Sequence, residues 1–151
     1  MEIIIIILGV ILDRITKMWA LKDLAIGRDL VIIKNFFQFS YLENTGAAFG
    51  IFRDKTIFLA IITFIIAIGI LFYLFKYKPQ SLILRLSLAF IISGAIGNLI
   101  DRVYYKYVVD FILLHYKDVY YFPTFNVADI FVTMGTALLA LYVIKEEKNG
   151  E

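Results

Sequence analysis

The chain has 151 residues, of which 62% are hydrophobic and 19% are charged, and its net charge is +2. A soluble domain of this length cannot bury that much apolar surface, so we expect lipid to cover much of the chain. The small net charge argues against a nucleic-acid partner, and the absence of cysteine excludes disulfides, thiolate metal sites and a cysteine nucleophile. With His115 as the single histidine, a histidine-rich metal site or a Ser-His-Asp triad is hard to build.

Four apolar segments are each long enough to cross about 30 Å of hydrocarbon as a helix. They are residues 3–21, 57–75, 82–100 and 125–144. The first could be mistaken for a cleavable signal peptide, but it has no basic leading region, it contains ionisable residues, and it shows no convincing small-x-small cleavage site. We therefore predict four transmembrane helices in a single membrane domain, residues 1–151.

Four spans place both termini on one side of the membrane, together with a short link at residues 76–81. Two longer loops, residues 22–55 and 101–124, lie on the other side. The density of Lys and Arg is highest around the short link, which favours a cytoplasmic location for it, whereas the total count favours the long loops. Composition alone therefore supports cytoplasmic termini only weakly.

The two long loops carry structural signals of their own. Residues 37–41 alternate aromatic with other side chains, which predicts a β-strand. The Asn44-Thr45-Gly46 segment that follows is typical of a turn, in which Gly46 is free to take a positive φ. Six of the ten tyrosines lie in the second loop, a density that suits a belt at the level of the lipid headgroups.

Polar and small residues recur at helical spacing in three of the predicted spans. The stripes are Gly9, Asp13 and Lys17; Gly94, Asn98 and Asp101; and Asn126, Asp129, Thr133 and Thr136. Each stripe lies on one helix face, and we expect these faces to meet near the long loops. Such residues commonly hold membrane helices together through close packing and hydrogen bonds. For Asp13 and Lys17, spaced four residues apart with the acid first, we favour a structural ion pair.

Two acids are difficult to explain as packing residues. Asp129 lies about one turn inside its predicted span with no basic residue within a turn of it in sequence, and Asp110 is flanked by four hydrophobic residues in the second loop. Two carboxylates brought together share one proton, so that one can act as a base and the other as an acid in peptide hydrolysis. Spacing alone leaves an alternative open, a small ion or proton channel or a transporter subunit that uses the same intramembrane acids.

Five short segments, in order along the chain, resemble the signatures of signal peptidase II, the bacterial lipoprotein signal peptidase family. They are Asp13-Arg-Ile-Thr16-Lys17; Asn44-Thr-Gly46-Ala47-Ala48-Phe49-Gly50; Gly94-Ala-Ile-Gly97-Asn98-Leu-Ile-Asp101-Arg102; Val108-Val109-Asp110-Phe111; and Phe125-Asn126-Val-Ala128-Asp129. Two positions depart from the family pattern. Ser93 stands where a glycine often opens the third signature, and Lys106 stands two residues before the fourth, where the family tends to have glycine.

The resemblance implies a membrane aspartic endopeptidase that removes signal peptides from diacylglyceryl-modified prolipoproteins by cutting before the lipidated cysteine. It makes Asp110 and Asp129 the catalytic pair. The residues it assigns to site shaping and to substrate or inhibitor binding are Asn44, Gly46, Asn98, Asp101, Arg102 and Asn126. Asp13 and Lys17 would be structural polar residues, and no metal or other cofactor is expected.

The resemblance also carries expectations about fold, location and partners. The expected fold is an all-α membrane protein, with four transmembrane helices, a small extracytoplasmic β-cradle and a short amphipathic surface helix. We expect a monomer in the cell inner (cytoplasmic) membrane, with both termini in the cytoplasm and the active site toward the periplasm or exterior. Its expected partners are prolipoproteins with a lipidated cysteine, membrane lipid and globomycin-like inhibitors, and not nucleic acid.

Overall fold

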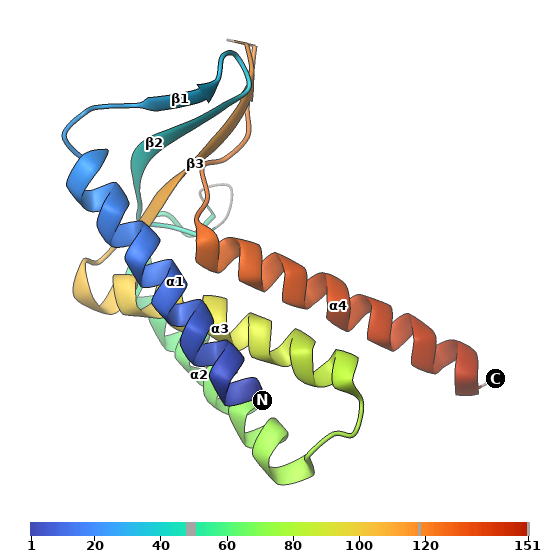
Figure 1. Ribbon diagram of the computed structural model, residues 1–151. Helices are drawn as coiled ribbons and strands as arrows, with labels where there is room; N and C mark the ends of the chain where they lie inside the picture. Colours follow the sequence, from blue (N-terminus) through green and yellow to red (C-terminus); the bar gives the residue numbers. More distant parts are fainter. Residues whose placement is uncertain (48–50, 118, 151) are drawn as a thin grey trace.

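The computed structural model describes residues 1–47, 51–117 and 119–150, which form a helical bundle with a sheet at one end (Figure 1). The helices are α1 (Glu2–Asp23), α2 (Thr56–Tyr77), α3 (Leu82–Tyr104) and α4 (Val127–Gly150). The strands are β1 (Leu30–Ile33), β2 (Phe37–Asn44), β3 (Val108–Tyr116) and β4 (Tyr120–Tyr121). Both termini lie at the end of the bundle away from the sheet.

Three of the helices are long and apolar enough to span a membrane: α2, α3, and α4 over Val127–Glu147. Helix α1 coincides with the first predicted span but is more charged, because ionisable residues interrupt its middle. Its apolar side chains, such as Ile4 and Leu8, are exposed, whereas Asp13 and Lys17 are fully buried. Apolar groups outside and charges inside are the arrangement that a lipid environment favours.

Helix α3 is central to the bundle. Half of its spanning window is buried, against 6% in α2 and 11% in α4, and the other three helices all pack against it. Glycines allow α4 to approach it closely, because a Cβ on Gly94 would collide with the backbone of Ala128 and one on Gly135 would lie 2.6 Å from the carbonyl oxygen of Ser87. Small residues at helix crossings serve the same purpose in membrane proteins generally.

Local signals set the ends of the helices. Helix α2 ends at Tyr77, and the next residue, Lys78, has a left-handed backbone (φ 44°) and precedes Pro79. Helix α3 begins after Ser81, whose side-chain oxygen accepts a hydrogen bond from the backbone N–H of Leu84. It continues beyond the predicted end at residue 100, so Asp101 and Arg102 lie on its last turns and not in a loop.

The sheet is antiparallel, with strand order β1-β2-β3-β4. Strand β2 confirms the strand predicted at residues 37–41 and extends to Asn44, which pairs with Val108 of β3. Trp19, near the end of α1, makes edge-to-face contacts with Phe39 and Phe111, with ring centroids 5.3 and 6.0 Å apart. These aromatic contacts hold the sheet against α1.

Two local expectations differ from the structure. Gly46 does not take a positive φ; among the described glycines, only Gly27 does (φ 82°). Gly46 is required for space instead, because a Cβ there would lie 2.9 Å from the carbonyl oxygen of Ile51. The described residues contain no short surface helix, and residues 51–54, just before α2, form turns. The fold is therefore mostly helical with a four-stranded sheet, while residues 48–50 of the second signature lie outside the described part of the chain.

Candidate active site

Asp129 lies in the first turn of α4, where it forms a reciprocal cap with Asn126. The Asn126 side-chain oxygen accepts a hydrogen bond from the backbone N–H of Asp129 at 2.9 Å, and Asp129 Oδ2 accepts one from the backbone N–H of Asn126 at 3.1 Å. This is the capping-box arrangement, with aspartate in place of the usual glutamate. The cap satisfies helix N–H groups and also fixes the Asp129 carboxyl at the edge of the bundle.

Asp110 lies on β3 opposite Leu42 and is 1% exposed. Asn44 Nδ2, from the end of β2, donates to Asp110 Oδ2 at 2.9 Å, and Asn126 Nδ2 donates to Asp110 Oδ1 at 2.6 Å. Burial, and after it the charge of Asp129, raise the pKa of Asp110 to about 7, although the two amide hydrogen bonds oppose the shift. Asn126 therefore bonds to both acids, one through its side chain and the other through its backbone.

Asn98 of α3 connects the two acids to the rest of the bundle. Its Nδ2 donates to Asp129 Oδ1 at 2.8 Å, and its Oδ1 accepts hydrogen bonds from Lys17 Nζ at 2.9 Å and from Asn126 Nδ2 at 3.2 Å. With both ends of the amide in use, the side chain can adopt only one orientation. The position of the Asp129 carboxyl therefore depends on that of Lys17 through Asn98.

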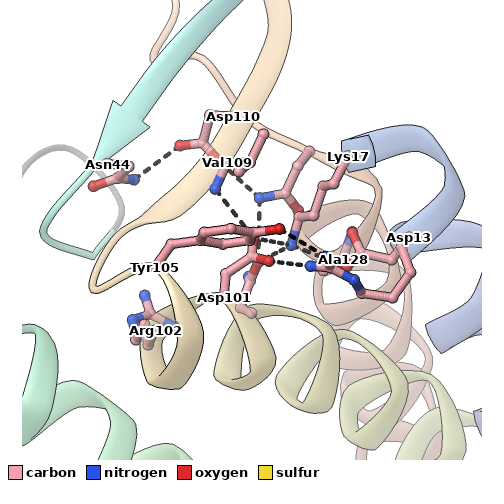
Figure 2. A network of polar contacts seen from close by, with 12 residues as sticks. Asp13, Lys17, Asn44, Asp101, Arg102, Tyr105, Val109, Asp110 and Ala128 are labelled. Carbon is pink, nitrogen blue, oxygen red and sulfur yellow. Dashed lines mark hydrogen bonds and ion pairs between the residues drawn. The ribbon is translucent and has the colours of Figure 1, made fainter. Parts of the chain in front are cut away.

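Lys17 belongs to a buried ionic cluster of four residues, shown in part in Figure 2. Its ammonium forms ion pairs with Asp13 and Asp101, each at 2.9 Å, and all three side chains are 0% exposed. Arg14 completes the cluster by pairing with Asp101, so two cations balance two carboxylates. The predicted Asp13–Lys17 pair is thus present, but it is half of a larger unit.

The two carboxylates of this cluster also hold the backbone of the elements that carry the acids. Asp13 Oδ1 accepts a hydrogen bond from the backbone N–H of Ala128 at 2.9 Å, next to Asp129. Asp101 Oδ2 accepts one from the backbone N–H of Val109 at 3.1 Å, next to Asp110. The residue directly before each acid in the sequence is therefore hydrogen-bonded to the buried cluster.

Arg102 reaches from α3 to the segment after β2. Its Nη2 donates to the carbonyl oxygen of Gly46 at 3.2 Å, and its Nε is buried without a hydrogen-bond partner among the described residues. Figure 2 shows its side chain on the side of the network nearest Asn44 and away from Asp13. An unpaired buried N–H group of this kind is costly unless another group binds to it. Among the described residues, no group of three or more His, Cys, Asp and Glu side chains could hold a metal ion.

The comparisons with known proteins agree on one family. The family model described as Signal peptidase (SPase) II matches residues 5–145. The lipoprotein signal peptidases of Clostridium novyi and Clostridium tetani are 60% and 63% identical, covering 98% and 97% of this chain and 100% and 94% of their own length. A solved bacterial membrane enzyme, 35% identical, superposes with a TM-score of 0.90 over 99% of this chain and 91% of that one. The chain belongs to the signal peptidase II family.

Membership of the signal peptidase II family determines the activity. The protein is a multi-pass membrane aspartic endopeptidase that processes prolipoproteins. The channel or transporter alternative is therefore set aside.

For this signal peptidase II, sequence reasoning brought together most of the residues that the structure joins. Every predicted site residue lies in one connected network, from Asp13 on α1 to Asn44 on β2. Arg14 was missed as a site residue, although its place beside Asp13 in the first signature was a signal. The Asn126–Asp129 cap was also missed, although an Asn followed three residues later by an acid is a readable helix start.

Proposed function

We propose that Asp110 and Asp129 are the catalytic pair of this peptidase. The observation that carries this proposal is their convergence on Asn126, which bonds to a carboxyl oxygen of each. They come from different elements, β3 and α4, so only the fold brings them together. Because burial and the neighbouring carboxylate raise the pKa of Asp110 to about 7, the pair retains a proton near neutral pH.

The proposed reaction uses that single proton. The ionised carboxylate removes a proton from a water molecule, which attacks the peptide carbonyl carbon, and the protonated acid donates its proton to the leaving nitrogen as the C–N bond breaks. The substrate is a prolipoprotein with a diacylglyceryl-modified cysteine, and the bond cut is the one before that cysteine. A substrate held in the membrane by its lipid needs only to diffuse sideways to reach the acids.

The surrounding residues divide into three proposed groups. Asn44, Asn98 and Asn126 orient the two carboxyls through the hydrogen bonds described above. Arg102 and Gly46 lie on the β2 side of the acids, where the Arg102 guanidinium is the charged donor that we assign to binding a substrate carbonyl oxygen. Asp13 and Asp101 hold the backbone next to the acids, and Lys17 pairs with both of these carboxylates.

The decisive experiment is cleavage of a lipidated prolipoprotein by purified, monodisperse variants in detergent. Asp110→Asn and Asp129→Asn keep the shape of the protonated acid but can neither accept nor release the required proton, so each should abolish turnover. Because the acids act as one unit, the double variant should be no worse than either single variant. Asp23→Asn, at the exposed end of α1, is the matched control and should retain full activity. Substantial turnover by either single variant would exclude the aspartyl dyad proposed here.

The proposed topology has four transmembrane helices, α1 included, with both termini in the cytoplasm and the acids toward the periplasm or exterior of the inner membrane. The position of the sheet and acids at one end of the bundle, with the termini at the other, supports placing the acids and the termini on opposite sides of the membrane. We propose that the enzyme works as a monomer, because the hydrogen bonds that orient both acids need no residue from a second copy. Globomycin-like cyclic peptides should compete with substrate at this site.

A further inference from the structure

A cavity of about 300 Å³ lies where the start of α1, the end of α2 and the α2–α3 link meet. In Figure 1 this is the end of the bundle away from the sheet. Helix α3 rises about 24 Å between Arg85, in the cavity wall, and Asp101, in the buried ionic cluster. The cavity is therefore separate from the peptidase site and has no part in the mechanism above.

The rim of the cavity has an excess of positive charge. Arg85 and Lys78 contribute two side-chain cations and Glu2 one carboxylate, which the Met1 ammonium also pairs with. Arg85 pairs with Glu2 through Nε, so its two Nη nitrogens have no hydrogen-bond or ion-pair partner among the described residues. The ammonium of Lys78 also has no such partner in the described part of the chain, and it is exposed.

The walls below this rim are hydrocarbon. Ile6, Leu71 and Leu74 line the cavity and pack against the core residues Ala89 and Ile92 of α3. The cavity thus has charged residues at its rim and apolar residues along its inner wall. A volume of this size is at the lower end of the range for small-molecule sites.

We propose that this cavity binds one anionic phospholipid, with its phosphate at Lys78 and Arg85 and part of an acyl chain along the apolar wall. A guanidinium with free Nη groups suits two phosphate oxygens, and a lysine adds a point charge beside it. A lipid with an anionic headgroup matches this lining, because its headgroup would lie at the cations and its acyl chain along the apolar wall. By filling the space between α1 and α2, which both pack on α3, the lipid stabilises the bundle at the end opposite the active site.

The test uses purified protein in a neutral detergent with phosphatidylglycerol, phosphatidylcholine or water-soluble glycerol 3-phosphate as probes. Native mass spectrometry should show one phosphatidylglycerol per chain, and thermal unfolding should shift to higher temperature with this lipid only. Phosphatidylcholine brings a positive choline to a positive rim, and glycerol 3-phosphate lacks the acyl chain. Lys78→Gln should weaken phosphatidylglycerol binding roughly five-fold, the effect of one lysine at a membrane surface.

Lys76→Gln is the matched control. It removes the same charge two residues earlier, but the Lys76 ammonium lies over the rings of Phe72 and Tyr77 and does not line the cavity. Its phosphatidylglycerol affinity should equal that of the parent. Equal losses in Lys76→Gln and Lys78→Gln, equal binding of the two lipids, equal stabilisation by glycerol 3-phosphate, or no retained lipid would each overturn the proposal.

Discussion

Lys106, where the expected signature pattern has glycine, has a left-handed backbone with φ of 69°. Its ammonium donates to the carbonyl oxygen of Val103 at 2.9 Å, which offsets part of the cost of that conformation. The turn between α3 and β3 is thus kept despite the departure from the family pattern. A residue other than glycine pays about 1 kcal/mol or more for such a φ.

We predict that Lys106→Gly raises the free energy of unfolding by up to about 1 kcal/mol, because glycine adopts this φ without a steric penalty. Lys106→Ala is the control, since it keeps the strained φ and loses the bond to Val103. It should be no more stable than the parent. Thermal unfolding in detergent distinguishes the two, and a Gly variant that is less stable than the Ala variant would contradict this account.

The raised pKa of Asp110 has a consequence for stability. Its folded pKa of about 7 lies above its ordinary value of 3.8, so between these pH values the folded state holds a proton that the unfolded state has lost. Stability contributed by this group therefore falls as pH rises through that window and is constant above it. Between pH 5.5 and 8.5 the expected loss is about 2 kcal/mol.

We predict that Asp110→Asn removes this pH dependence. The measurement is the difference in unfolding free energy between pH 5.5 and 8.5 for each protein, because the amide also alters the hydrogen bonds from Asn44 and Asn126 at every pH. The parent should lose more stability than the variant over this range. An identical pH dependence in both would show that another group is responsible.

At the scale of elements, the buried ionic cluster joins α1 and α3 to the backbone of β3 and α4. Lys17 is its centre, since it pairs with Asp13 and Asp101 and also bonds to Asn98. Removing one member of a buried ion pair leaves an uncompensated charge and typically costs about 3–5 kcal/mol. Loss of the cluster should therefore lower the stability of the fold and also displace Asp110 and Asp129.

We predict that Lys17→Met lowers the free energy of unfolding by roughly 3 kcal/mol or more, because Asp13 loses its cation and Asp101 keeps only Arg14. The double variant Asp13→Asn, Lys17→Met should recover part of that loss, since it removes the unpaired carboxylate as well. Lys22→Met, at the exposed end of α1, controls for loss of a lysine and should be close to neutral. A double variant less stable than Lys17→Met would argue against charge burial as the cause.

At the scale of the whole molecule, the remaining question is which end of the bundle faces the cytoplasm. Because the chain has no cysteine, single cysteines can be introduced without background. We predict that Thr45→Cys, near the acids, is labelled by an impermeant thiol reagent from outside intact cells or spheroplasts. Gln80→Cys, in the α2–α3 link, should be labelled only after the membrane is opened. The reverse pattern would invert the proposed topology.

The sequence by itself determined the membrane class, the four long helices and strand β2, and it singled out the two acids that we propose as the catalytic pair. These follow from local properties: composition decides whether water or lipid is the solvent, and alternation or helical spacing decides which face of an element is polar. Asp110 stood out because four hydrophobic residues surround it, which is a property of five consecutive positions. The five signatures then supplied the family without any knowledge of contacts.

Only the tertiary structure decided how these residues are joined. Lys17 was assigned to Asp13 because they are four residues apart, yet it is shared with Asp101 and Asn98, more than 80 residues away in the chain. Gly46 was expected to serve a turn through its φ, whereas it is needed because the backbone near Ile51 passes close to it. A polar group taken out of water must find a partner wherever packing places one, and sequence spacing does not record which distant segments meet.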